Sequence, residues 1–215
     1  MSQLLFSGTL DTIYMISMAT LFALLGGLPL GILLTIWKQD GIVPFVAGEQ
    51  VLGGIINTIR SVPFIILIIA LFPITRLLVG RSYGIHASVV ALVIGAIPFV
   101  ARLIESALLE VDDGLIKAAI TMGATPFQII SKVYLVESIP SLIRAISLTM
   151  ITLVGYAAMA GVVGGGGLGD IAIRYGLHRY QTDVMFATIL IMVLLVQLIQ
   201  TTFNYLANRL DHRRP

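Results

Sequence analysis

Four long stretches of this sequence contain no Asp, Glu, Lys or Arg, and no other feature limits the possible folds as strongly. A helix that crosses the roughly 30 Å hydrocarbon core of a bilayer needs about 20 residues, and every stretch reaches that length. A helix also pairs its backbone N–H and C=O groups within one segment, as a bilayer requires. The sequence therefore predicts membrane-spanning helices in the charge-free residues 12–37, 82–101, 145–169 and 184–208.

Composition indicates an integral membrane protein in contact with lipid. Charged residues make up 11% of the 215 residues and hydrophobic residues 58%, whereas soluble domains are about 25% charged. The net charge of +2 is too small and too scattered to indicate a nucleic-acid partner. The chain has no cysteine, which excludes disulfides and thiolate chemistry, and its three histidines are too far apart in sequence to predict a metal site.

A further span is less clearly marked. The charge-free stretch 61–75 is too short, so we extend the predicted helix back to residue 55, which places Arg60 near the lipid headgroups. Arg60 can then reach the headgroups, pair with a partner or help to gate a pathway. Pro63 and Pro73 are expected to kink or end this helix. We predict an all-α membrane protein with a single domain, residues 1–215, and five spans at about 12–37, 55–75, 82–101, 145–166 and 184–208.

Charge predicts the orientation of these spans. Five spans put the two termini on opposite sides, and Lys and Arg are enriched in cytoplasmic loops. With the N-terminus outside and the C-terminus inside, nine cations fall on the cytoplasmic side and four outside. The nine are Lys38, Arg60, Arg102, Lys117, Lys132, Arg144, Arg209, Arg213 and Arg214, and the four are Arg76, Arg81, Arg174 and Arg179.

Small residues and charge pairs predict local packing. Ala157, Gly161 and Gly165 recur every four residues, so they are expected to share one helix face and to allow close approach of another helix. The four glycines 164–167 are expected to end that helix. They are not read as a phosphate loop, because no Lys-Ser/Thr follows and no strand precedes. Arg102 and Glu105 are spaced for an ion pair along one helix.

Residues 112–136 form a moderately polar segment between very apolar ones. The acidic pair at 112–113 predicts a helix start, and Gly123 can adopt the left-handed conformation that closes a helix. A capping box with a first-turn proline follows at Thr125, Pro126 and Gln128. Two short helices joined at Gly123 are therefore predicted. Their spacing alone fits a hairpin on the membrane surface as well as a contact with a soluble partner.

This segment resembles the cytoplasmic loop of permeases from binding-protein-dependent ABC importers. That signature reads Glu-Ala-Ala, three residues, Gly, nine residues, an apolar residue, any residue, Leu and Pro. The matching positions here are Lys117, Ala118, Ala119, Gly123, Val133, Leu135 and Val136. Lys117 replaces the Glu and Val136 replaces the Pro. Two further segments, NTIRSVPFIIL (57–67) and YAAMAGVVGGGGLGD (156–170), look like the permease subunit of methionine importers.

The resemblance implies a type I importer permease with five transmembrane helices and a cytoplasmic coupling-helix loop, in a bacterial inner membrane. It implies a homodimer that binds two ATP-binding cassette subunits and an extracytoplasmic substrate-binding protein. ATP is then bound and hydrolysed by a partner subunit, so we expect this chain to hold no cofactor and to be no enzyme. The residues implied to contact the ATPase are Lys117, Ala118, Ala119, Gly123, Ala124, Thr125, Pro126 and Phe127.

The implied substrate is methionine, in the L or D form, moved by alternating access. Another small amino acid, a small osmolyte, or a structural membrane subunit that transports nothing are the alternatives. The residues themselves show no nucleotide-binding motif and no catalytic set of side chains. The clean spans also lack the mid-membrane ionisable groups of secondary transporters, so the energy is expected to come from another subunit.

Met159 is the candidate gate of the pathway, with Gly155 and Tyr156 beside it. A methionine side chain is flexible and apolar, so two copies that meet at a dimer axis can close a pathway and withdraw without leaving a buried polar group unpaired. A methionine that only packs against helices or lipid fits the sequence equally well.

Overall fold

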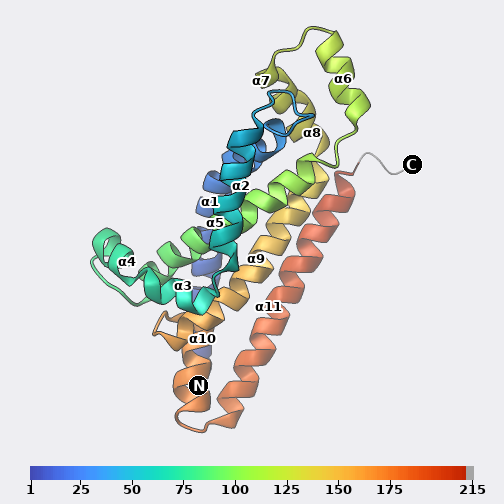
Figure 1. Cartoon of the computed structure of the whole chain (residues 1–215). Coiled ribbons are helices and arrows are strands. Elements are labelled where there is room, and N and C mark those ends of the chain that lie inside the picture. The colour runs from blue at the N-terminus through green and yellow to red at the C-terminus, as the bar shows by residue number, and fades with distance from the viewer. Residues whose placement is uncertain (212–215) are drawn as a thin grey trace.

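The computed structural model describes residues 1–211, which fold into helices and short connections without a strand. The long helices α1 (Ser2–Ile36), α5 (Ile85–Leu108), α9 (Ile139–Val162) and α11 (Thr182–Arg209) form an elongated bundle (Figure 1). Four helical stretches are long and apolar enough to cross a membrane, and a bent pair provides up to a fifth. The all-α prediction is confirmed for this part of the chain. Arg213 and Arg214, which contribute to the predicted charge asymmetry, lie outside the described residues.

The core lies where α1, α5 and α9 meet, and small residues bring these helices close together. Met15, Leu92 and Leu153, one from each helix, are fully buried there. A Cβ atom added at Gly31 of α1 would lie 2.7 Å from the carbonyl oxygen of Ala101 in α5. Because lipid tails are as apolar as leucine, such close backbone contact is a main source of helix association in a membrane. α11 packs at the edge of this bundle and leaves most of its apolar side chains exposed.

The expectation that Pro63 ends the helix within the predicted span 55–75 is confirmed, whereas Pro73 neither kinks nor ends a helix. The structure has α2 (Val46–Ser61), α3 (Phe64–Ala70) and α4 (Phe72–Val79), and α2 and α3 meet at 99°. The break occurs because the ring of Pro63 disfavours a helical conformation of the preceding residue, and Val62 is extended with ψ of 125°. Pro73 has the opposite effect and lies in the first turn of α4, where a missing N–H costs nothing.

The other helices differ from the predicted spans mainly at their ends. α1 starts at Ser2 rather than near residue 12, α5 continues past residue 101 to Leu108, and α9 starts at Ile139 rather than 145. Single charges did not end these helices because a charged side chain can be paired or extended without breaking the backbone ladder. The length criterion therefore found the helices but cut them short.

Gly165 does not share a helix face with Ala157 and Gly161, because α9 ends at Val162. The chain turns through left-handed glycines, with φ of +75° at Gly164 and +85° at Gly166, and continues as α10 (Gly167–Ile171) and the π-helical segment η2 (Ala172–Leu177). A Cβ atom at Gly161 would collide with the backbone of α10. Close approach therefore occurs at Gly161, but against the segment that follows the turn.

Three elements are held together by one buried carboxylate. Glu105 on α5 is 5% exposed and accepts from Arg102 Nη1 at 2.7 Å, as its spacing predicts, and also from Lys38 Nζ at 3.0 Å. Arg102 Nη2 in turn donates to the carbonyl oxygen of Gly53 in α2 at 3.1 Å. Lys38 follows α1, so this cluster joins α1, α2 and α5 near one end of the bundle.

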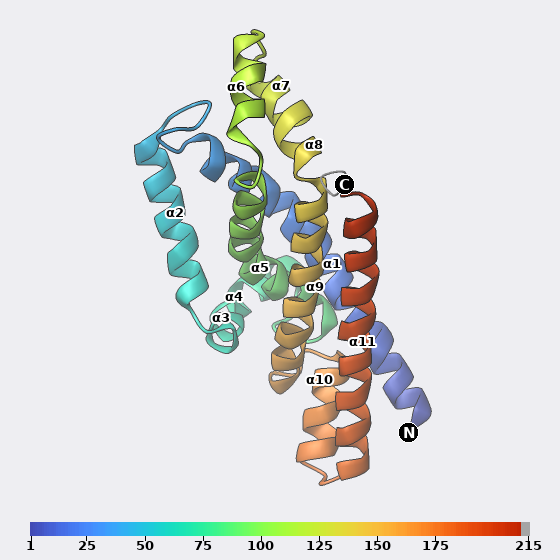
Figure 2. The same cartoon turned by 90° about the vertical axis from the view of Figure 1, so that its right-hand side faces the viewer.

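Figures 1 and 2 show that the polar segment projects beyond that end of the bundle. It comprises α6 (Asp113–Thr121), α7 (Pro126–Ile129), the π-helical segment η1 (Ile130–Tyr134) and α8 (Leu135–Glu137). The C-terminal end of α11 lies on the same side, whereas the N-terminus lies at the opposite end of the bundle.

Candidate functional site

The polar segment folds as its local signals predict. The Asp112 side chain accepts from the Gly114 N–H at 2.7 Å and starts α6. Gly123 is left-handed with φ of +76°. The Thr125 N–H then donates to Gln128 Oε1 at 2.9 Å, while Thr125 Oγ1 accepts from the Gln128 N–H at 3.4 Å. The predicted left-handed glycine and capping box are both confirmed, and together they set the angle between α6 and α7.

This segment presents apolar side chains to its surroundings. α6 has no buried residue, Met122 is 87% exposed and Phe127 is 77% exposed. Large exposed apolar side chains on a projecting segment indicate a contact surface for another protein. Most of the predicted ATPase-contact residues share this exposure, namely Lys117, Ala118, Gly123, Thr125, Pro126 and Phe127. Ala119 and Ala124 are instead partly buried and pack against the core.

The inner side of α6 faces a cavity of about 410 Å³. Lys117, Asp113 and Tyr134 line it, together with the turn after α1 at Asp40. Burial of the Tyr134 ring, reinforced by the nearby Asp113 carboxylate, raises the pKa of the Tyr134 hydroxyl above its usual value. The phenol therefore stays neutral at physiological pH. α6 packs inward through partly buried side chains such as Ile116 and Ala119, and its outer face stays exposed.

The predicted pathway residues lie on α9, with Gly155 and Met159 on an open side of it. Met159 is 45% exposed, and a Cβ atom added at Gly155 would meet nothing within 4 Å. Leu148 and Val162 extend the same exposed stripe along the helix. Ala157 points to the opposite side and is buried in the core. Because these residues share one helix face, the stripe can face a second copy of the chain or a pathway.

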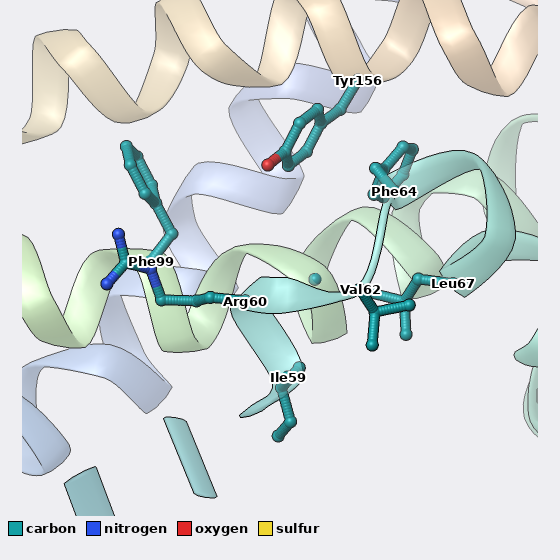
Figure 3. A pocket seen from close by; sticks show the side chains of 8 residues that line it. Ile59, Arg60, Val62, Phe64, Leu67, Phe99 and Tyr156 are labelled. Carbon is teal, nitrogen blue, oxygen red and sulfur yellow. The ribbon is translucent and has the colours of Figure 1, made fainter. Parts of the chain in front are cut away.

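Tyr156, the third predicted pathway residue, lies beside a cavity. Its ring stacks on Phe64 of α3, with centroids 4.3 Å apart and planes at 3°. The adjoining cavity has a volume of about 230 Å³ and is shown in Figure 3. Its lining comes from α2, α3, α5, α9 and the break between α2 and α3, and consists of Ile59, Arg60, Val62, Phe64, Leu67, Gly95, Phe99 and Tyr156.

This cavity is not predicted by the sequence, although Arg60 and Tyr156 are among the candidate residues. Arg60, Phe99 and Tyr156 are distant in sequence and meet only because the chain turns sharply after α2. The one available signal was an arginine three residues before a proline, inside an otherwise apolar segment. Among residues 1–211, no group of three or more His, Asp or Glu side chains is placed to hold a metal ion.

Comparisons with known proteins show which family this chain belongs to. The family model for binding-protein-dependent transport system inner membrane components matches residues 27–214. The chain is 50% identical over 212 residues to the probable D-methionine transport system permease protein MetI of Vibrio cholerae, covering 99% of this chain and 94% of that protein. It is 53% identical over 205 residues to the corresponding protein of Pasteurella multocida, covering 95% and 94%.

Solved structures show the same architecture. A chain from inward-facing conformations of the MetNI methionine ABC transporter superposes with a TM-score of 0.96 and 43% identity, over 98% of this chain and 97% of that one. An amino acid ABC transporter solved with histidines shares the fold, with a TM-score of 0.74 and 21% identity over 99% and 95%. The predicted all-α, type I importer permease fold is confirmed. This chain belongs to the family of binding-protein-dependent transport system inner membrane components.

Proposed function

We propose that this chain is the permease subunit of an ATP-driven importer and that its substrate is methionine. The observation that carries this proposal is the similarity to D-methionine permeases over almost the whole length of both chains. The exposed, capped segment around Gly123 adds physical support, because a permease driven by another subunit needs a projecting contact surface. The chain itself moves the substrate by alternating access.

The working assembly is a homodimer with two ATP-binding cassette subunits and an extracytoplasmic substrate-binding protein. The ATPase contacts α6 and α7 through exposed residues outside the cavity on the inner side of α6, such as Ala118 and Phe127, and ATP stays in the ATPase. Lipid covers the apolar side chains that α11 leaves exposed. The stripe with Met159 lines the interface between the two permease copies, where the pathway opens and closes.

The direct test is uptake of labelled L- and D-methionine by a strain that lacks this gene. Uptake of at least one form is expected to fall to background and to return when the gene is restored. Unchanged methionine uptake with loss of another small amino acid or osmolyte would move the assignment to that substrate. Unchanged uptake of all of them would favour a structural subunit.

The proposed orientation places the N-terminus outside and the polar segment inside, on the basis of the positive-inside rule. Arg60 lies in the last turn of α2, away from the end of the bundle that carries Lys38, so without it the charge split is eight to four. Because the chain has no cysteine, single reporters can be introduced at Ser2 and Met122. The Ser2→Cys variant is expected to react with an impermeant thiol reagent in intact cells, and the Met122→Cys variant only after permeabilisation. The reverse labelling pattern would contradict this orientation.

The proposed gate is tested by truncating Met159. A Met159→Ala variant is expected to raise passive leak of methionine through reconstituted, ATP-free transporter, because shortening two side chains that meet at an axis opens the closed pathway. The matched control is Met192→Ala on the peripheral helix α11, which is expected to leave the leak unchanged. An unchanged leak and unchanged uptake in the Met159→Ala variant would exclude this methionine as the gate.

A further inference from the structure

Arg60 is an exposed cation at the edge of a largely apolar cavity, and within residues 1–211 no anionic partner is found for it. It lies in the last turn of α2, where its side chain lines the cavity beside Phe99 and Tyr156. Within residues 1–211 it forms no ion pair, although Arg102, Arg144 and Arg174 each do. An ionised side chain among apolar helices normally pairs with another charge or faces a polar cavity, and it commonly marks a ligand site. The cavity therefore has a cation available for a bound anion.

The cavity combines this single cation with apolar and aromatic walls. Its eight lining residues include Arg60 as the only charged side chain and the rings of Phe64, Phe99 and Tyr156. Figure 3 shows these rings on the wall opposite the α2 backbone, with the Tyr156 hydroxyl pointing to the side where Arg60 and Phe99 lie. At about 230 Å³ the cavity is smaller than the roughly 300–1,000 Å³ of drug-sized sites. Its size and lining suit a small molecule with one carboxylate and an apolar side chain.

We propose that this cavity binds the transported amino acid inside the permease, with the Arg60 guanidinium paired to its α-carboxylate. This inference rests on the proposed function. A guanidinium presents paired N–H donors that match a carboxylate, which is why arginine rather than lysine suits such a contact. The rings of Phe64 and Phe99 contact the side chain of the ligand. A thioether sulfur is well suited to this position, because sulfur interacts favourably with aromatic rings.

The backbone around Arg60 fixes its position at the corner of the chain. Ser61 Oγ donates to the carbonyl oxygen of Thr58 at 2.7 Å, and the Val62 N–H donates to the carbonyl oxygen of Ile59 at 3.2 Å. These hydrogen bonds join the residues after Arg60 to the residues before it and so hold the last turn of α2 in place. α3 then leaves at 99° and brings Phe64 to the opposite wall. The break imposed by Pro63 is therefore what creates the site.

The cavity has no anionic side chain to pair with the ammonium group of an amino acid, since none of its lining residues is Asp or Glu. Recognition then depends on the carboxylate and the side chain. These two groups can be placed in the same positions by either enantiomer if the ammonium group points away from Arg60. We therefore expect the permease site to bind L- and D-methionine with similar affinity.

The experiment measures occupancy of the cavity directly with a thiol reporter. Because the chain has no cysteine, Val62→Cys adds a single reactive side chain to the lining. The permease–ATPase complex is placed in nanodiscs, and the rate of thiol modification is followed on the permease band with and without ATP. Methionine is expected to slow modification in at least one of these states. Methionine amide, which lacks the carboxylate, is expected to protect only at much higher concentration.

Variants of Arg60 then test the contact itself. In the Val62→Cys background, Arg60→Gln is expected to raise the methionine concentration for half-protection by roughly tenfold to a hundredfold, the range for losing a hydrogen bond to a charged group. Arg60→Lys is expected to lie between Arg60→Gln and the unchanged site. Arg81→Gln, which removes a cation outside the cavity, is the matched control and is expected to have no effect. A reporter at Leu77, which is 85% exposed and outside the cavity, is expected to be indifferent to methionine.

Failure of this proposal is separable from failure of the proposed function. Methionine uptake and co-purification of the ATPase are measured on the same complexes, so a misfolded permease variant is recognised because it no longer binds its ATPase subunit. If the Val62→Cys complex transports methionine but methionine never protects the reporter, or protects equally in the Arg60→Gln background, the carboxylate site is wrong. If the unchanged complex transports no methionine, the proposed substrate is wrong.

Discussion

Replacing Glu105 with alanine is expected to destabilise the helix bundle by about 3 kcal/mol, the low end of the cost of removing one member of a buried ion pair. The low end applies because Lys38 and Arg102 keep side-chain exposures of 37% and 22%, so water partly compensates for their lost partner. Three elements lose their common anion at once. The measurement is the midpoint of thermal unfolding of the purified permease in detergent, which is expected to fall by several degrees.

The ion pair between Arg174 and Asp170 provides the matched control. It joins oppositely charged side chains four residues apart, but Arg174 is 57% exposed. Asp170→Ala is therefore expected to cost less than about 1 kcal/mol. Glu105→Gln, which keeps the shape and one acceptor, is expected to lie between the two alanine variants. Equal midpoints for Glu105→Ala and Asp170→Ala would show that the buried cluster contributes no more than a surface pair.

Gly123→Val is expected to leave the membrane helices intact and to lose coupling to the ATPase. Valine at φ of +76° would be held in a left-handed conformation that costs on the order of 1–2 kcal/mol. Relief of that strain changes the angle between α6 and α7, and 1.4 kcal/mol corresponds to about tenfold in a local equilibrium. The readouts are co-purification with the ATPase and stimulation of ATP hydrolysis by substrate-loaded binding protein. Stimulation is expected to fall by about tenfold.

At Gly123 a larger side chain would strain the backbone without clashing with a neighbour, because an added Cβ atom there would meet nothing within 4 Å. Gly54 in α2 has equally open surroundings and an ordinary helical conformation, so Gly54→Val is the matched control and is expected to keep coupling. Lys117→Glu restores the usual residue of the family loop and is expected to be tolerated if helix shape dominates the contact. Normal coupling in the Gly123→Val variant would exclude the proposed role of this glycine. Complete loss in the Lys117→Glu variant would show that the partner is adapted to a positive charge.

The features that sequence predicted well depend on neighbours in the chain. Charge-free length identified the long helices, and the capping box at Thr125 and Gln128 follows from residues three positions apart. The break at Pro63 also follows from a neighbour, because a proline restricts the residue before it, here Val62. The 99° angle between α2 and α3 and the start of α2 at Val46 were not predicted, because charge-free length says nothing about the direction of a helix or about its charged ends.

Of the two candidate sites, the one built from neighbouring residues was predicted and the one built from distant residues was not. The coupling segment was recognisable because its glycine and caps act locally. The cavity beside Arg60 was not, because Phe99 and Tyr156 reach it from helices whose packing no local signal encodes. The second cation of the Glu105 cluster was missed for the same reason, since Lys38 belongs to a different element. Spacing predicted only the partner three residues away.

The bend after α2 leaves Arg60 near a helix end that is anchored only further back along the helix. The hydrogen bond from Arg102 to the Gly53 carbonyl is a fixed point near the middle of α2, and Arg60 lies seven residues further along, or about 10 Å. A tilt about that point would displace the guanidinium in proportion to this arm, relative to Phe99 on α5 and Tyr156 on α9. Any tilt of α2 would therefore change the distance from the cation to these two rings without bending the helices that carry them.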